Sequence, residues 1–166
     1  MTNSPAVNLA DYIRDVADFP KPGIMFKDIT PLLASHAALE ACIDQFVEKY
    51  KDEKIDVIAA AEARGFLFAV PLAMRLGIGM VPIRKPGKLP YEKKSYTYDL
   101  EYGTDTLEMH VDAVTPGQKV LVVDDLLATG GTVSACCEMV EEIGAEVVGC
   151  AFLLSLIHIS EPTRPY

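Results

Sequence analysis

Residues 119–132 read KVLVVDDLLATGGT. The continuous apolar run of this stretch, 120–123, follows a Pro-Gly turn and predicts a strand that is buried on both faces of a parallel sheet. Asp124 and Asp125 then lie at the carboxyl end of that strand. Ligands of open α/β sheets bind at this edge, so we expect the acidic pair to belong to a binding site.

The loop after the acidic pair predicts an anion site. Residues 128–132, Ala-Thr-Gly-Gly-Thr, carry little side-chain bulk, so their backbone N–H groups can close on a ligand, and the two threonines add hydroxyl donors. Apolar residues then recur at helical spacing over 133–143, and Gly144 is placed to end the helix. A strand, a Gly-rich loop and a helix N-terminus together favour phosphate. Beside two acids, they indicate a ligand with both a phosphate and vicinal hydroxyls, such as a sugar phosphate.

The composition limits the classes of function. The chain has 166 residues, of which 50% are hydrophobic, and this suits one globular domain. A net charge of −9 argues against binding to nucleic acids or anionic membranes, because both reward an excess of Lys and Arg. No apolar run reaches the roughly 20 residues of a membrane span, and the N-terminus does not read as a signal peptide. We therefore expect a cytoplasmic protein, and the scattered histidines and cysteines predict no metal site.

The other periodic segments complete a doubly wound α/β sheet. Alternating residues between Tyr96 and Val111 predict a β-hairpin that stands apart from the parallel sheet. The short apolar segment 24–29 predicts a turn. Helices are predicted from Ser4-Pro5 to Val16, from Ser35 to Tyr50 and over 66–76, and strands over 55–61, 78–83 and 146–154.

Basic residues follow two of the predicted strands. Arg64 lies at the carboxyl end of the strand 55–61, on the same sheet edge as the acidic pair, where its guanidinium can meet a diphosphate with two hydrogen bonds. Arg84, Lys85 and Lys88 follow the strand 78–83 in a polar segment with Gly and Pro that runs to Ser95. A basic cluster in a strongly acidic chain indicates a local anion site. We expect this segment to be a mobile flap that closes over diphosphate.

Five stretches resemble one family. Residues 119–132 resemble the 5-phosphoribosyl 1-diphosphate (PRPP) signature of the type I phosphoribosyltransferases. EARGFLF at 62–68 resembles the diphosphate loop of the family. FPKPGIMFKDI at 19–29, RKPGKLP at 84–90 and LEYG at 100–103 resemble the branch that acts on adenine. The resemblance covers residues 1–154. It implies a type I phosphoribosyltransferase fold with a small hood, and the purine salvage reaction in which adenine and PRPP give AMP and diphosphate.

The resemblance also implies a role for each site residue. The two acids would hold the ribose hydroxyls, and Glu101 would assist proton movement at the purine. The basic residues would neutralise the diphosphate, and a cis peptide bond would join Glu62 to Ala63. Adenine would be held by Met25, Phe26 and Lys27, and the 5′-phosphate by Ala128, Thr129, Gly130, Gly131 and Thr132. Leu126 would also bind the substrate. Mg²⁺ would arrive bound to PRPP without a ligand from the protein, and the chain would form a homodimer.

The resemblance stops at Ser155. The segment 155–166 has no helical or strand period and looks like translated adapter sequence, so we expect a domain over 1–154, without its last hood element, and a non-native tail. Two other functions stay open. A type I phosphoribosyltransferase for another base would share the PRPP loop, and a non-catalytic sensor of PRPP or purines would share the fold.

Overall fold

The computed structural model describes residues 6–100, 102–126 and 130–154. The chain divides into two compact units, Met1–Glu48 and Lys49–Tyr166. The predicted tail, 155–166, lies outside the described residues, and its non-native origin stays a prediction. Within the described ranges, none of the helices has the length and apolar character that crossing a bilayer requires.

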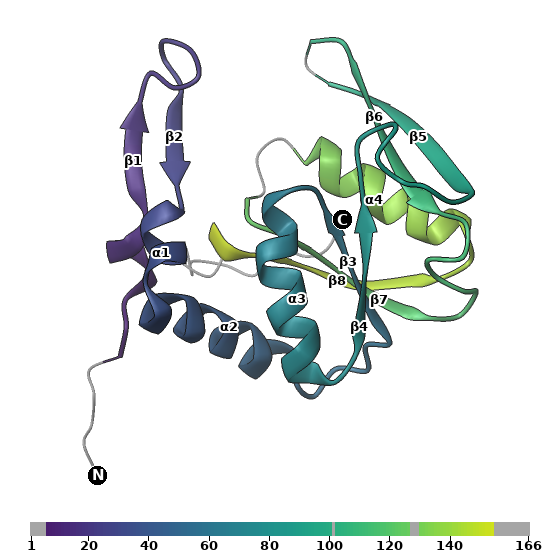
Figure 1. Ribbon diagram of the computed structural model, residues 1–166, viewed down its shortest axis with the longest axis horizontal. Helices are drawn as coiled ribbons and strands as arrows, with labels where there is room; N and C mark the ends of the chain where they lie inside the picture. The colour runs from purple at the N-terminus through teal and green to yellow at the C-terminus, as the bar shows by residue number, and fades with distance from the viewer. Residues whose placement is uncertain (1–5, 101, 127–129, 155–166) are drawn as a thin grey trace. The chain divides into compact units, whose positions relative to one another are not determined.

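The first unit is built from a hairpin and short helices (Figure 1). Its elements are the 3₁₀ helix η1 (Leu9–Tyr12), the strands β1 (Arg14–Ala17) and β2 (Met25–Asp28), the helix α1 (Thr30–Ala34) and most of α2 (His36–Tyr50). Helix α2 agrees with its prediction. The side chain of Ser35 accepts a hydrogen bond from the backbone N–H of Ala38 at 3.3 Å, so Ser35 provides the N-terminal cap.

Two predictions for this unit are wrong. The helix expected up to Val16 is a single 3₁₀ turn, because Ile13 adopts extended backbone angles and the chain continues as β1. The segment expected to be a turn contains β2, which pairs antiparallel with β1 and places Val16 opposite Phe26. Strand pairing between distant residues has overridden the helical spacing of the apolar residues, a common outcome for short segments.

The second unit contains a four-stranded sheet in which every neighbouring pair is parallel. The strand order is β4-β3-β7-β8. The two central strands have the most apolar sequences, VIAAA and KVLVVD, as expected for strands that are covered on both faces. The bounds of the strands are β3 (Val57–Ala61), β4 (Gly79–Ile83), β7 (Lys119–Asp124) and β8 (Glu146–Phe152).

Helices cover both faces of this sheet, as the doubly wound prediction requires. Helix α4 (Gly131–Glu142) packs through Cys136 and Met139 on the face that carries Val57 and Val122. Helix α3 (Arg64–Leu76) covers the opposite face, where its second residue, Gly65, closely approaches β3 and β7. Successive side chains of a strand point to opposite faces, so the two helices sandwich the sheet.

The predicted hairpin is also present. Strands β5 (Lys93–Asp99) and β6 (Thr104–His110) pair antiparallel as a separate two-stranded sheet beside α4 (Figure 1). Leu107 and Met109 are buried in the core on the α4 side. Because β5 already begins at Lys93, the basic flap between β4 and β5 is shorter than the expected segment ending at Ser95.

Candidate active site

The candidate site lies at the carboxyl ends of β3, β4 and β7. Strand β7 ends at Asp124, and β3 and β4 are followed directly by Glu62 and Arg84. A pocket of about 220 Å³ lies at this edge. The residues around it include Glu62, Arg64, Lys85, Asp124, Asp125 and Thr132. The sheet edge therefore gathers the acidic pair, two of the predicted cations and the end of the predicted phosphate loop.

The acidic pair is held tightly in place. Asp125 is 4% exposed, and its carboxylate pairs with Nε of Arg64 at 2.9 Å. Its backbone N–H donates to Oδ1 of Asp124 at 2.8 Å. Burial raises the pKa of Asp124 to about 7; the hydrogen bond from the Asp125 amide opposes this rise, and the negative charge of Asp125 adds to it. Near neutral pH, Asp124 is therefore poised between its neutral and charged forms.

Gly65 allows helix α3 to start against β7. A Cβ atom at this position would lie 2.9 Å from the backbone oxygen of Val123 and 3.3 Å from Oδ1 of Asp124. The first distance is too short for any side chain. Glycine therefore brings Arg64, the preceding residue, within reach of the acidic pair.

The described part of the phosphate loop lies at the N-terminus of α4. Gly130 precedes the helix with φ 87°, a left-handed conformation that favours glycine, and α4 begins at Gly131. Leu126, Gly130 and Thr132 all line the pocket. The first N–H groups of a helix lack partners within it, so this end favours an anion. Ala128 and Thr129 lie outside the described residues.

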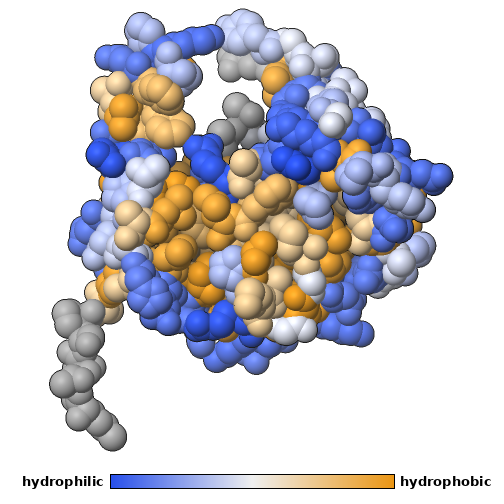
Figure 2. Space-filling view, viewed as in Figure 1, coloured by the Kyte–Doolittle hydropathy of each residue, from blue (hydrophilic) through white to orange (hydrophobic). Residues whose placement is uncertain are grey.

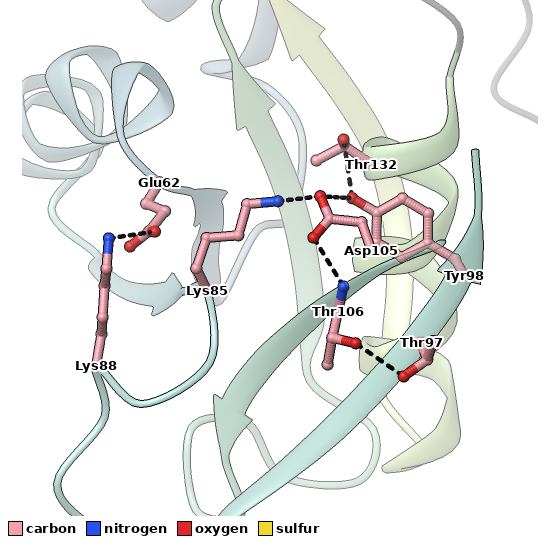
Figure 3. A network of polar contacts seen from close by, with 8 residues as sticks. All are labelled: Glu62, Lys85, Lys88, Thr97, Tyr98, Asp105, Thr106 and Thr132. Carbon is pink, nitrogen blue, oxygen red and sulfur yellow. Dashed lines mark hydrogen bonds and ion pairs between the residues drawn. The ribbon is translucent and has the colours of Figure 1, made fainter. Parts of the chain in front are cut away.

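Every predicted diphosphate cation on the flap has a carboxylate partner. Glu62 accepts from Nε of Arg84 at 2.7 Å and from Nζ of Lys88 at 2.8 Å, one cation on each oxygen. Lys85 pairs with Asp105 of β6 (Figure 3). Only Lys85 of these three cations borders the pocket itself. The flap cations are thus neutralised by internal acids beside the site.

A chain of hydrogen bonds joins the flap to the phosphate loop. The Tyr98 hydroxyl lies 3.3 Å from Oδ2 of Asp105 and 3.2 Å from Oγ1 of Thr132, and the Thr106 N–H donates to Oδ1 of Asp105 at 2.8 Å (Figure 3). A carboxylate only accepts, so Tyr98 donates to Asp105 and receives the hydrogen of Thr132. Burial favours a higher pKa for Asp105, but the hydrogen bonds from Lys85 and Thr106 hold its pKa below the ordinary value.

Sequence reasoning missed three residues of this region: Glu62, Tyr98 and Asp105. Glu62 had a usable signal, since it directly follows a buried strand at the ligand-binding edge. Tyr98 and Asp105 had none, because their contacts depend on how the hairpin packs on α4. The peptide bond between Glu62 and Ala63 is cis, as the resemblance predicted.

Three of the four residues expected to hold the base lie in the first unit. In β2, the side chain of Lys27 pairs with Asp15 at 2.5 Å, and the Phe26 ring packs edge-on against Phe19 at 5.1 Å. Met25 is 54% exposed. Glu101 lies outside the described residues. The roles of these four predicted base-site residues stay predictions.

Comparisons with known proteins identify the family. Residues 28–164 match the family model of the phosphoribosyl transferase domain. Over 158 residues, the chain is 60% identical to an adenine phosphoribosyltransferase of Maridesulfovibrio salexigens, and the match covers 95% of this chain and 93% of that protein. The chain belongs to the adenine phosphoribosyltransferase family. A second member, from Rhodopirellula baltica, is 57% identical over 162 residues, which cover 96% of this chain and 79% of the relative.

Solved structures of this family share the fold. The adenine phosphoribosyltransferase of Thermoanaerobacter pseudethanolicus superposes with a TM-score of 0.85 at 56% identity, covering 87% of this chain and 84% of that one. The Saccharomyces cerevisiae enzyme gives a TM-score of 0.82 at 40% identity, with the same two shares, 87% and 84%. Its crystal structure is a complex with an imino-altritol bisphosphate and adenine. The predicted type I phosphoribosyltransferase fold is thereby confirmed.

Proposed function

We propose that this chain transfers the 5-phosphoribosyl group from PRPP to adenine, forming AMP and diphosphate in purine salvage. The observation that carries the proposal is one pocket bordered by the acidic pair, by cations and by the N-terminus of α4. PRPP needs all three, because it presents vicinal hydroxyls, a diphosphate and a 5′-phosphate. The identity to adenine phosphoribosyltransferases supports adenine as the acceptor.

The acidic pair would act on the ribose. Bond exchange at the anomeric carbon develops positive charge on the sugar as diphosphate leaves. The carboxylates of Asp124 and Asp125 accept hydrogen bonds from the ribose hydroxyls and favour that charge. The pair between Asp125 and Arg64 holds one carboxylate in a fixed orientation. Orientation and preorganised charge then supply most of the rate.

The leaving diphosphate would be neutralised by the basic residues. Arg64 and Lys85 already border the pocket, and Arg84 and Lys88 pair with Glu62, which also borders it. Arginine binds phosphate oxygens through two parallel N–H groups, whereas lysine acts as a point charge. These cations stabilise the negative charge that develops on the leaving diphosphate. The barrier to bond cleavage is therefore lower.

The 5′-phosphate would lie at the start of α4. Gly130, Gly131 and Thr132 offer backbone N–H groups at a helix N-terminus, where the helix dipole favours negative charge. Leu126 borders the same pocket. Ala128 and Thr129 complete this loop in the proposal. The phosphate would hold one end of PRPP while the diphosphate leaves from the other.

The acceptor base would be held by the remaining predicted residues. Phe26 stacks on adenine, and the backbone groups of Met25 and Lys27 hydrogen-bond its edge. Glu101 takes part in removing the purine proton. Aromatic stacking suits a flat purine, and the adenine bound to the Saccharomyces cerevisiae relative supports a purine pocket in this family.

Mg²⁺ would reach the site on the substrate. Among the described residues, no group of three or more His, Cys, Asp or Glu side chains could hold a metal ion. The diphosphate and hydroxyl oxygens of PRPP would hold the ion, since hard oxygen ligands suit Mg²⁺. When bound, the ion neutralises part of the diphosphate charge.

The proposal includes a homodimer in the cytoplasm. Leu67, Val70 and Met74 lie on one face of α3 and are 45%, 45% and 76% exposed, and Figure 2 shows apolar surface over this helix. Side chains spaced three and four residues apart form a stripe that a second copy could cover. Light scattering coupled to size exclusion should give twice the monomer mass, and Met74→Glu should reduce it.

A panel of bases tests the proposed function. Purified protein with PRPP and Mg²⁺ should form nucleotide from adenine and not from hypoxanthine, guanine or orotate. Turnover of hypoxanthine but not adenine would overturn the choice of base. In the same assay, Arg84→Ala should raise the KM for PRPP more than the KM for adenine. An unchanged KM for PRPP would remove the flap from the mechanism.

A further inference from the structure

Glu62 is a buried carboxylate whose two oxygens are both occupied by flap cations. Its side chain is 7% exposed, and its partners are Arg84 at 2.7 Å and Lys88 at 2.8 Å. Burial favours a higher pKa for Glu62, but the hydrogen bonds from Lys88 and Arg84 hold its pKa below the ordinary value. Glu62 also borders the pocket, between β3 and the cation Arg64. The carboxylate of Glu62 therefore binds the same cations that the proposed reaction assigns to diphosphate.

The two cations are more exposed than their acceptor. The side chains of Arg84 and Lys88 are 34% and 50% exposed, so water already reaches both. Glu62 is fixed at the end of β3, where its backbone N–H donates to the oxygen of Ile83 at 2.9 Å. The cations can turn toward a ligand while the carboxylate stays in place.

Glu62 keeps a partner when its cations leave. The backbone N–H of Lys85 also donates to its carboxylate. A buried carboxylate without any donor would be costly, and this amide lowers the cost of exchange. Diphosphate carries several negative charges against the single charge of Glu62, so it can draw the cations away.

We propose that Glu62 competes with diphosphate for Arg84 and Lys88, and so weakens the binding of the leaving group. The inference rests on the proposed function, because that function assigns the two cations to diphosphate. A competing internal anion keeps the cations in place in the free protein. It also favours release of diphosphate after transfer, when Glu62 recovers both partners. The contacts of Glu62 with Arg84 and Lys88 must break before diphosphate binds these cations. The free energy of those contacts therefore subtracts from the binding free energy of diphosphate.

Calorimetric titration with diphosphate and Mg²⁺, without base, tests this competition. Glu62→Gln keeps the shape of the side chain and removes its charge, so diphosphate should bind about tenfold more tightly than to the wild type. A purely structural role for Glu62 predicts the reverse, since a flap without its anchor would present its cations less well. Equal or weaker binding by Glu62→Gln would overturn the proposal.

Glu142→Gln is the matched control. Glu142 is exposed at the last residue of α4, about 17 Å along the helix axis from Gly131. The same loss of one charge at that distance should leave the dissociation constant unchanged. A tightening equal to that of Glu62→Gln would mean that net charge and not competition sets the affinity.

A second measurement uses the wild-type protein and does not depend on how the variant folds. In a crystal structure with diphosphate and Mg²⁺, Arg84 and Lys88 should contact the ligand and should have left Glu62. Retention of both Glu62 contacts in that complex would overturn the competition. If the wild type neither forms AMP nor binds diphosphate, the proposed function itself fails. If it does both while Glu62→Gln binds no more tightly, only the inference about Glu62 fails.

Discussion

Replacing Asp124 by Asn removes a carboxyl whose pKa burial raises to about 7 from an ordinary 3.8. Between these two values the folded protein binds a proton that the unfolded chain has released. Stability therefore falls as the pH rises from about 4 to about 7, and changes little from this group above pH 8. Asn is neutral at every pH, so the stability of the variant does not fall in this way.

The size of the effect follows from the shift. A difference of about three pKa units corresponds to about 4 kcal/mol at 1.36 kcal/mol per unit, and partial access of water to the side chain reduces this to about 2–4 kcal/mol. Asp124→Asn should therefore be more stable than the wild type by this amount at pH 8. The two proteins should have nearly equal free energies of unfolding at pH 4, where both side chains are neutral in the folded state.

Urea unfolding at several pH values measures the difference directly. The other acids titrate in both proteins, so the difference in the free energy of unfolding between variant and wild type isolates Asp124. The exposed Asp52, changed to Asn, serves as control and should alter stability by less than about 0.5 kcal/mol at each pH. A difference for Asp124→Asn that stays constant from pH 5 to pH 8 would refute the reasoning.

Three further outcomes are expected. The ionised form of Asp124 accepts hydrogen bonds from the ribose hydroxyls. The value of kcat/KM for PRPP should therefore rise about tenfold per pH unit up to about pH 7 and level off above it. A profile that is flat from pH 5 to pH 8 would contradict this. Asp125→Asn should lower kcat/KM by about a hundredfold or more, since it removes the charge that pairs with Arg64 beside the sugar; full AMP formation would remove Asp125 from the mechanism. Gly65→Ala should destabilise the protein by about 1–3 kcal/mol in urea unfolding, because its Cβ would lie 2.9 Å from the Val123 oxygen, and an unchanged midpoint would show that α3 moves freely.

The parallel sheet could be predicted from sequence because its strands are continuous apolar runs. Val57–Ala61 and the run at 120–123 have no polar face, as a strand covered on both faces requires. The first helix could not be predicted. Apolar residues between Leu9 and Val16 fit a helical stripe, but Val16 pairs with Phe26 of a strand that local spacing does not reveal.

The candidate site divides in the same way. Arg64 and Asp125 could be predicted to lie together, since each follows a strand of one parallel sheet and such ends share an edge. The contact between Glu62 and Arg84 follows from the same rule, because they directly succeed Ala61 and Ile83, which are paired in β3 and β4. The other partners of the flap cations could not be predicted, since Lys88 meets Glu62 only through the path of the flap. Asp105 meets Lys85 only because the hairpin packs beside α4.

The most direct test of the central claim is the stoichiometry of products from adenine and PRPP. Wild-type protein with Mg²⁺ should form AMP and diphosphate in equal amounts, measured by chromatography and by a coupled diphosphate assay, and Asp125→Asn should form little of either. Diphosphate release without AMP would mean that water and not adenine attacks the sugar. AMP formation that survives the loss of Asp125 would contradict the proposed site.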